Sequence, residues 1–181
     1  MGIGGRTMLD EAEAARLERG EVRVHAEPVA GSRWPRLVTR AILAAPAEAA
    51  WALVADVERW AEYMPRVREA RPLPPDGATL RTRMTLAMPF PLPDLTAVVR
   101  ALHYIEPGVR YAREWTLESG DYTANDGSWV LVPHAGDAGR SLLTYRIHAA
   151  PTMPLPRFVQ VAAQERAMPG LVAAMRARLG A

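Results

Sequence analysis

The spacing of apolar and polar residues changes along this chain from a helical period to an alternating one and back again. Between Arg66 and Ala150, apolar residues alternate with polar ones, which is the period of strands that bury one face. Turn-forming Pro, Gly and Asp residues divide this segment into six predicted strands, at about 67–73, 79–88, 95–104, 110–117, 127–133 and 141–149. Because connections this short join antiparallel neighbours, the segment predicts an antiparallel sheet with one dry face.

The stretch before this sheet predicts one strand and two short helices. Residues 36–44 form the first main strand, and Pro46 follows at a position where proline suits the first turn of a helix. Asp56 is placed to cap a second helix with its carboxylate. That helix groups three residues on one face by their i, i+3, i+4 spacing: Trp60, Tyr63 and Met64.

Both ends of the chain are also predicted to contain helices. Residues 157–179 are rich in Ala, Met, Leu, Gln and Arg, and Pro169 is expected to kink or restart this long helix. The helix is the expected cover for the dry face of the sheet. At the other end, residues 8–19 predict a short helix and residues 21–25 a short strand.

Several local stretches add a more specific signal to this order of elements. They are AAPAEAAWALVAD (44–56) continued by VERWAEYMPRV (57–67), Gly127-Ser128-Trp129 followed by LLTYR (142–146), and Pro154-Leu155-Pro156 before the last helix. In this order they resemble the START-like superfamily, also called SRPBCC. Its members include lipid-transfer domains, ubiquinone-binding proteins, polyketide cyclases and plant pollen allergens.

The resemblance implies an α+β architecture known as the helix-grip fold. A curved antiparallel sheet of six to seven strands would wrap around the long C-terminal helix, with two short helices after the first strand. The resemblance covers residues 36–181, which we interpret as a START-like ligand-binding domain. Residues 1–35 lie outside it and are interpreted as an N-terminal extension.

Composition and charge narrow the functional classes. The chain has no cysteine, which excludes disulfides, thiolate catalysis and Cys-based zinc sites. Every basic residue is arginine, which explains a pI near 9.4 at a formal charge of only +2. These arginines are spread along the whole chain, so we expect no nucleic-acid partner. No apolar stretch is long enough to span a membrane, and we expect a cytoplasmic protein without metal or other cofactor.

In relatives of this fold, the gap between sheet and helix holds a hydrophobic ligand. Methionine adapts to variable apolar guests, and aromatic rings offer rigid walls. The residues expected to contact a ligand are therefore the Met, aromatic and aliphatic residues near the dry faces: Trp60, Tyr63, Met64, Met84, Met88, Trp115, Trp129, Tyr145, Phe158, Val161 and Met168. Packing of a solid core is the competing interpretation for each of them, so the cavity rests on the resemblance.

Charged and titratable residues near the dry faces are candidates for a polar anchor. Arg113 shares a phase with Trp115 and other apolar residues, which points it inward, whereas Glu114 would become the interior charge if the direction were reversed. An inward guanidinium requires an acceptor from the protein or a ligand. His103 also has an inward phase, either as a ligand contact or as a satisfied core residue, while His148 is expected to face water.

The proline-rich loop 89–94 presents Phe90 beside the expected cavity mouth on a stiff backbone. It is either a gate that transiently touches a membrane or a partner, or a rigid hairpin connection. The chain leaves the oligomeric state open.

Three functions are consistent with these features. The leading one is non-catalytic binding or transfer of a hydrophobic small molecule, such as a lipid, isoprenoid or quinone. The second is an enzyme similar to polyketide cyclases and aromatases, with Arg113, His103 or Tyr145 positioning and protonating its substrate. The third is a protein-interaction module that uses the N-terminal helix and the proline-rich loop. The sequence reveals no activated nucleophile or paired acid and base, so we assign no catalytic residues and favour a binder over an enzyme.

Overall fold

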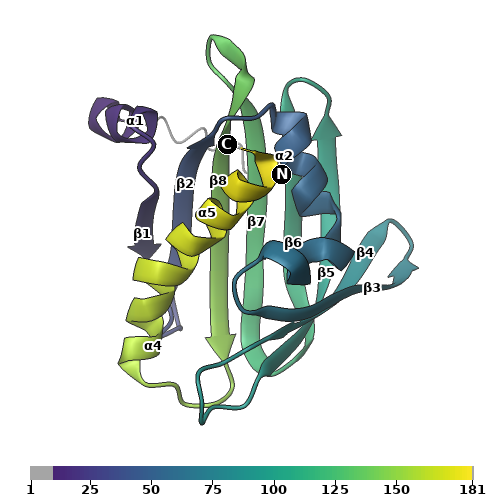
Figure 1. The fold of residues 1–181 in the computed structure, drawn as a ribbon. Helices are drawn as coiled ribbons and strands as arrows, with labels where there is room; N and C mark the ends of the chain where they lie inside the picture. The colour runs from purple at the N-terminus through teal and green to yellow at the C-terminus, as the bar shows by residue number, and fades with distance from the viewer. Residues whose placement is uncertain (1–9, 181) are drawn as a thin grey trace.

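The chain folds into an antiparallel sheet with most of its helices gathered on one side (Figure 1). The structure, a computed structural model, describes residues 10–180, without the side chains of residues 157, 160, 161, 163 and 164. The elements follow one another in the order α1 (Glu11–Glu18), β1 (Arg23–Glu27), β2 (Arg36–Leu43), α2 (Ala47–Ala55), η1 (Val57–Arg59), α3 (Trp60–Tyr63), β3 (Val67–Asp76), β4 (Thr79–Leu86), β5 (Leu95–Glu106), β6 (Arg110–Gly120), β7 (Tyr122–His134), β8 (Asp137–Pro151), α4 (Arg157–Ala162), η2 (Ala163–Ala167) and α5 (Met168–Leu179).

The sheet has eight strands in the order β1-β2-β8-β7-β6-β5-β4-β3. Strands β3 to β8 form a meander of antiparallel neighbours, as their short connections predicted. Strand β2 returns to lie beside β8, and β1 pairs with β2 at the edge. The helix-grip fold is therefore confirmed, with more strands than the six or seven expected because the N-terminal segment contributes β1.

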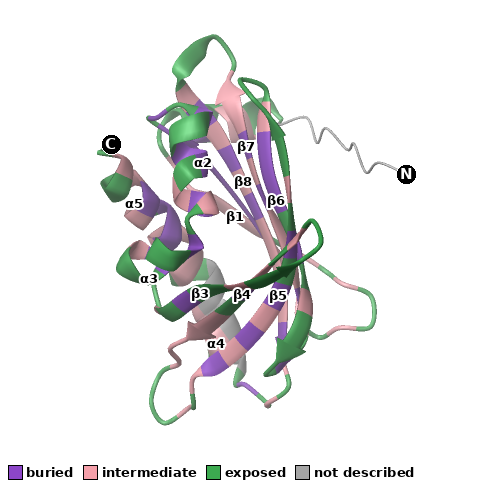
Figure 2. Cartoon of the chain, turned by 90° about the vertical axis from the view of Figure 1, so that its right-hand side faces the viewer, coloured by how far each residue is buried: buried purple, intermediate pink, exposed green. Residues whose placement is uncertain are grey.

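Residues of different burial alternate along the strands, and α2, α3 and α5 lie on one side of the sheet (Figure 2). Along β5, Leu95, Ala97 and Val99 are buried, whereas the residues between them are not. This alternation follows from the pleat of a strand, which sends successive side chains to opposite faces. Strand phase therefore determines which side chains of the sheet point toward the helices, and we call this side the inner face.

The C-terminal helix is interrupted, as Pro169 predicted. A short α-helix, α4, passes into the π-helical segment η2, and α5 then begins at Met168 with Pro169 in its first turn. Proline is tolerated there because its missing N–H needs no partner in a first turn. At the other end, Gly180 adopts a left-handed φ of 77°, which closes the helix.

The N-terminal segment docks on the rest of the chain. Leu17 of α1 is 1% exposed, and both carboxylate oxygens of Glu13 accept hydrogen bonds from Arg40 Nη1 at 2.9 and 2.8 Å. Arg176 of α5 donates to the carbonyl of Gly20 at 3.0 Å and to that of Ile42 at 2.9 Å. Residues 10–27 are therefore held by the same packing as the sheet, while the start of the predicted helix, residues 8 and 9, lies outside the described residues.

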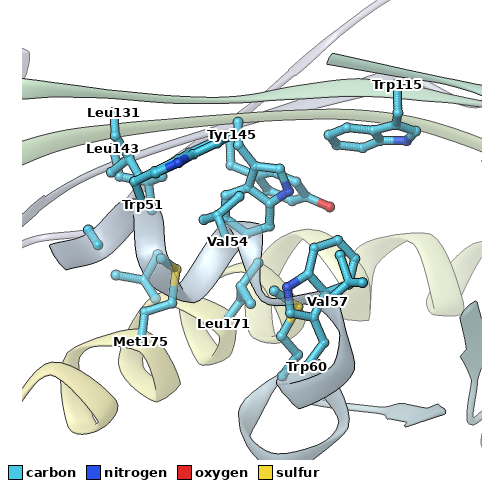
Figure 3. Close-up of a cluster of buried hydrophobic side chains, with 14 of the residues drawn as sticks. Trp51, Val54, Val57, Trp60, Trp115, Leu131, Leu143, Tyr145, Leu171 and Met175 are labelled. Atoms are coloured by element: carbon cyan, nitrogen blue, oxygen red, sulfur yellow. The ribbon is translucent and has the colours of Figure 1, made fainter. Parts of the chain in front are cut away.

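Helices α2 and α5 pack on the inner face through a cluster of large apolar side chains (Figure 3). Seven of its members from α2, α5, β7 and β8 are less than 9% exposed: Trp51, Val54, Leu131, Leu143, Leu171, Val172 and Met175. These side chains fill the space between α5 and strands β7 and β8.

The buried ion pair between Glu13 and Arg40 predicts a measurable stability effect. In Glu13→Gln, the Arg40 guanidinium, whose side chain is 7% exposed, loses its counter-charge. We expect a loss of about 2 kcal/mol in the free energy of unfolding, below the roughly 3–5 kcal/mol of fully buried pairs, because Glu13 is itself partly exposed. Urea denaturation measures this loss.

The matched control is Glu69→Gln, which removes one partner of an exposed pair with Arg71. It is expected to change stability by less than about 0.5 kcal/mol. Equal effects of the two substitutions would contradict the structural role given to Glu13.

Candidate ligand-binding site

Three adjacent strands bring one polar cluster together on the inner face. Arg113 on β6 lies opposite His103 on β5 in the strand register, and Thr82 is on the next strand, β4. Arg113 Nη2 donates to Thr82 Oγ1 at 2.9 Å, and Arg113 Nη1 lies 3.0 Å from His103 Nε2. The guanidinium also lies over the ring of Trp60, at 5.3 Å from its centroid.

Arg113 is a buried cation. Its side chain points inward, as its strand phase predicted, and the residue is 1% exposed, whereas Glu114 faces outward. Burial lowers the pKa of Arg113 to about 10, so the guanidinium is still charged at neutral pH. Among the described residues, no carboxylate lies within 4.0 Å of it. The charge is therefore met by neutral acceptors and by one aromatic face.

His103 is held in its neutral form by these surroundings. Burial, and secondly the positive charge of Arg113, lower the pKa of His103 to about 4. Because a guanidinium only donates, His103 Nε2 must be the acceptor of their hydrogen bond, which places the ring proton on Nδ1. The edge-to-face contact with Trp51, at 4.9 Å and 78°, fixes the imidazole further.

A cleft of about 350 Å³ leads to this cluster. It lies between the α2–η1 connection and the β3–β4 hairpin, and both Thr82 and Arg113 line it. Apolar side chains supply much of the wall: Val57, Pro72, Leu73, Pro75 and Leu80. This size and lining are typical of small-molecule sites, which combine apolar walls with a few convergent polar groups.

Two acidic residues, Asp56 and Glu58, also line the cleft. The expectation that the Asp56 carboxylate caps the second helix is wrong, because no side-chain hydrogen bond to the helix is formed. The first turn instead uses the backbone carbonyl of Asp56, which accepts from the N–H of Arg59 at 3.3 Å. The carboxylate of Asp56 is thus left at the cleft, where it adds negative charge on the α2–η1 side.

The predicted aromatic residues divide into two groups. The rings of Trp129 and Tyr145 lie 4.0 Å apart and are tilted by 32°, whereas Trp115 stacks on Tyr145 at 6.0 Å. The indole N–H of Trp115 donates to Asn125 Oδ1 at 3.0 Å. Burial raises the pKa of Tyr145, so its phenol keeps its proton. These three rings pack against one another on the inner face as part of the buried core.

The second group consists of Trp60 and Tyr63 on α3, beside the Arg113 cluster. Trp60 Nε1 and the Tyr63 hydroxyl both donate to the carbonyl of Leu53, at 3.3 and 2.9 Å. These bonds tie α3 to the last turn of α2 and leave the face of Trp60 turned to Arg113. The α2–α3 pair is therefore the part of the structure that covers the buried cation.

The remaining predicted ligand contacts are scattered. Met64 is 8% exposed and belongs to the buried core cluster. Three partly buried methionines pack against that cluster: Met84, Met88 and Met168. The side chain of Val161 lies outside the described part of the structure. Phe90 and Phe158 turn their rings to solvent instead of a cavity, with exposures of 97% and 67%, because the proline loop and the first turn of α4 hold them outward.

Sequence reasoning missed Thr82 and Trp51. Thr82 shares its strand phase with Leu80 and Met84. A polar residue in this apolar row is the sequence feature that could have indicated an inward-facing hydroxyl. Trp51 lies on α2, and its position in a helix does not reveal that its ring contacts His103 across the core.

The described residues include no group of three or more His, Asp or Glu side chains arranged to hold a metal ion. No helix among them is long and apolar enough to cross a membrane.

Comparison with known proteins assigns the family. The profile of the family described as "Polyketide cyclase / dehydrase and lipid transport" matches residues 43–176. The chain therefore belongs to this family, within the START-like superfamily. No curated protein matches the chain.

Solved structures with the same fold include carriers and enzymes. The chain is similar to the STAR-related lipid transfer protein from Xanthomonas axonopodis (TM-score 0.74, 19% identity, 88% of this chain and 94% of that one). It is similar to human StAR-related lipid transfer protein 5 (TM-score 0.71, 12% identity, 93% and 92%). It is also similar to the Zhui aromatase/cyclase from Streptomyces sp. R1128 (TM-score 0.60, 16% identity, 88% and 94%). At these identities the likeness establishes the fold alone.

The lowered pKa of His103 predicts a pH-dependent stability. Between the ordinary value of 6.5 and about 4, the unfolded chain binds a proton on this histidine that the folded protein does not. Stability contributed by neutral His103 is therefore lost as the pH falls through this window. The unfolding free energy of the wild type should fall between pH 7 and pH 4.5, and His103→Gln should make that fall smaller by about 1 kcal/mol. The expected effect is modest because the ring is only half-buried and solvent screens its charge. Parallel pH profiles for both proteins would contradict it.

The structure leaves no room for a side chain at Gly127, beneath the ring of Trp115. A Cβ at this position would lie 2.2 Å from the carbonyl oxygen of Arg146 and 2.5 Å from the Trp115 ring. Gly127→Ala is therefore expected to cost about 2 kcal/mol of unfolding free energy. Gly139→Ala, whose Cβ would meet only the Asp137 carboxylate at 3.2 Å, is the control and should be nearly neutral in thermal denaturation.

Proposed function

We propose that this protein binds a hydrophobic small molecule, such as a lipid, isoprenoid or quinone, without catalysing its conversion. The observation that carries the proposal is Arg113, a buried cation without a carboxylate partner among the described residues, which lines a cleft large enough for a small molecule. A cation in that position has capacity for an oxygen acceptor that the protein itself does not supply. The ligand-binding unit would be residues 36–181, with 1–35 as an N-terminal extension of which the described part, from residue 10, docks on it.

The two parts of such a ligand would be recognised differently. Its apolar part would be held by removal of its surface from water, which contributes roughly 25 cal/mol per Å². Its carbonyl or carboxylate would accept a charge-assisted hydrogen bond from Arg113, which contributes roughly 1.5–3 kcal/mol. The acidic side of the cleft, with Asp56 and Glu58, would favour entry of a ligand with few negative charges.

Transient membrane contact is part of this proposal. The only two phenylalanines of the chain are Phe90 and Phe158, and both rings are largely exposed. Phe90 is carried on a proline-rich loop that restricts the backbone, so little order is lost when its ring is inserted into an apolar phase. Exposed rings of this kind support pick-up or delivery of a ligand at a lipid surface.

A cyclase-like enzyme is the second candidate, and the pairing of His103 with Arg113 is what favours it. A neutral imidazole beside a guanidinium resembles a base next to a group that stabilises an oxyanion. The pKa of His103 near 4 nevertheless leaves very little imidazolium at neutral pH to act as a proton donor, and Nε2 is already occupied by Arg113. The binder is therefore the function that this geometry supports best.

The test is binding of a fluorescent fatty acid, cis-parinaric acid, to the full chain and to Arg113→Met. We expect saturable binding by the wild type and an affinity at least about tenfold weaker in the variant, because one charge-assisted hydrogen bond is lost. Replacement of a buried cation by an apolar side chain of similar volume should leave the fold intact, which circular dichroism checks.

Arg110→Met is the matched control, since Arg110 lies on the same strand but its side chain is 42% exposed. Equal affinity in all three proteins, or absence of saturable binding by the wild type, would refute the proposal. Organic extraction of the purified protein and mass spectrometry identify any lipid or quinone that co-purifies. Loss of turnover of a poly-β-ketothioester in His103→Ala would instead favour the enzyme.

A further inference from the structure

A second cluster of polar side chains lies on the outer face of the sheet, opposite Arg113. Its members are Ser32 in the loop before β2, Asp126 on β7 and His148 on β8. Asp126 and His148 are direct partners in the strand register, so their side chains stand next to each other on one face. His148, which its strand phase placed toward water, is only 5% exposed because the loop that contains Ser32 covers it.

The three side chains form a continuous chain of hydrogen bonds. His148 Nδ1 lies 3.1 Å from Asp126 Oδ1, and His148 Nε2 lies 3.1 Å from Ser32 Oγ. An ionised carboxylate only accepts, so Nδ1 carries the proton that is donated to Asp126. In the neutral ring, Nε2 is then the acceptor for the Ser32 hydroxyl. The order is a hydroxyl, a base and a group that orients the base, which is the pattern of an activated nucleophile.

Neighbouring groups fix this arrangement further. Arg36 Nη2 donates to the second oxygen of Asp126, Oδ2, at 3.1 Å, which orients the carboxylate. The backbone N–H of Trp34 donates to Ser32 Oγ at 3.0 Å. That bond stabilises negative charge on the serine oxygen and leaves one lone pair on Oγ for attack.

The surroundings of Ser32 offer access and a site for a developing negative charge. Ser32 is only partly buried, and a Cβ added to the preceding residue, Gly31, would meet nothing within 4 Å. Within the described part of the chain, the N–H of the next residue, Arg33, donates to no backbone acceptor. The N–H that follows a nucleophilic serine is well placed to stabilise an oxyanion.

We propose that Ser32 is a nucleophile that accepts the acyl group of small activated esters, with His148 as its general base and Asp126 as a positioning residue. Ser32 Oγ forms a bond to the ester carbonyl carbon while His148 Nε2 takes the hydroxyl proton. The carbon–oxygen bond to the leaving group then breaks, and His148 returns the proton to the departing alkoxide. Water, deprotonated by the same histidine, hydrolyses the acyl-serine and restores Ser32. This activity is independent of the interior cleft.

The position of Ser32 separates this site from the family signature. The family profile matches residues 43–176, so Asp126 and His148 lie inside it and Ser32 lies outside it. The nucleophile is thus contributed by the docked N-terminal part of this chain.

The test is labelling of the full-length wild-type protein by a fluorophosphonate probe, followed by peptide mapping. We expect one covalent adduct, on Ser32, and none in Ser32→Ala. Asp126→Asn, which keeps the side-chain shape, should lower the labelling rate at least about tenfold, because the imidazole loses its orienting carboxylate. Asp126→Glu should recover part of that rate, which a purely structural role for Asp126 would not predict.

Ser128→Ala is the matched control, since Ser128 lies on the same outer face of β7 and should not affect labelling. Hydrolysis of p-nitrophenyl acetate with an initial burst provides an independent readout of the same acyl-serine. A folded wild-type protein that is not labelled at Ser32 overturns the proposal, and so does labelling at an unchanged rate in Asp126→Asn. A loss of stability in Ser32→Ala without wild-type labelling would assign the cluster to anchoring of the loop and would also overturn it.

Discussion

The burial of one guanidinium group constrains the interior of this protein more than any other interaction. A charge removed from water must be met by acceptors, and those that the protein gives to Arg113 are all neutral: Thr82, His103 and the face of Trp60. Each acceptor is fixed in turn, since His103 must stay unprotonated and Trp60 is oriented by its bond to Leu53. None of these groups carries negative charge, so the cation is held by hydrogen bonds and one aromatic face without a counter-charge among them.

The topology explains why this cluster forms at one end of the sheet. Strands β4, β5 and β6 are consecutive neighbours, so residues of equal phase on them meet without any long connection. The α2–α3 pair then covers the cation from the other side. Under α5, by contrast, large apolar side chains from α2, β7 and β8 close the core. The cleft consequently lies where the α2–η1 connection and the β3–β4 hairpin diverge, away from the C-terminal helix.

Strand periodicity predicted the sheet, the covering helix and the inward direction of Arg113, because a period of two allows only two faces and the apolar neighbours select one. Periodicity gives no information on what covers a face. It therefore placed His148 toward water, although a loop 116 positions away in sequence buries it. The same limit applies to Phe90 and Phe158, whose exposure depends on how a loop and a helix end are held. Cross-core partners such as Thr82 became visible only with the strand register.

The two histidines illustrate how neighbouring charges determine chemistry on a single sheet. His103 is partly buried beside a cation, and burial first and that charge second suppress its protonation, so it is a fixed acceptor for Arg113. His148 faces the carboxylate of Asp126, which orients its ring and directs the other nitrogen at a hydroxyl. A histidine that accepts from a guanidinium is fixed by that bond, whereas one placed between a carboxylate and a serine retains a lone pair for proton transfer. The inner face is thus suited to holding a molecule, and the outer face to activating a hydroxyl.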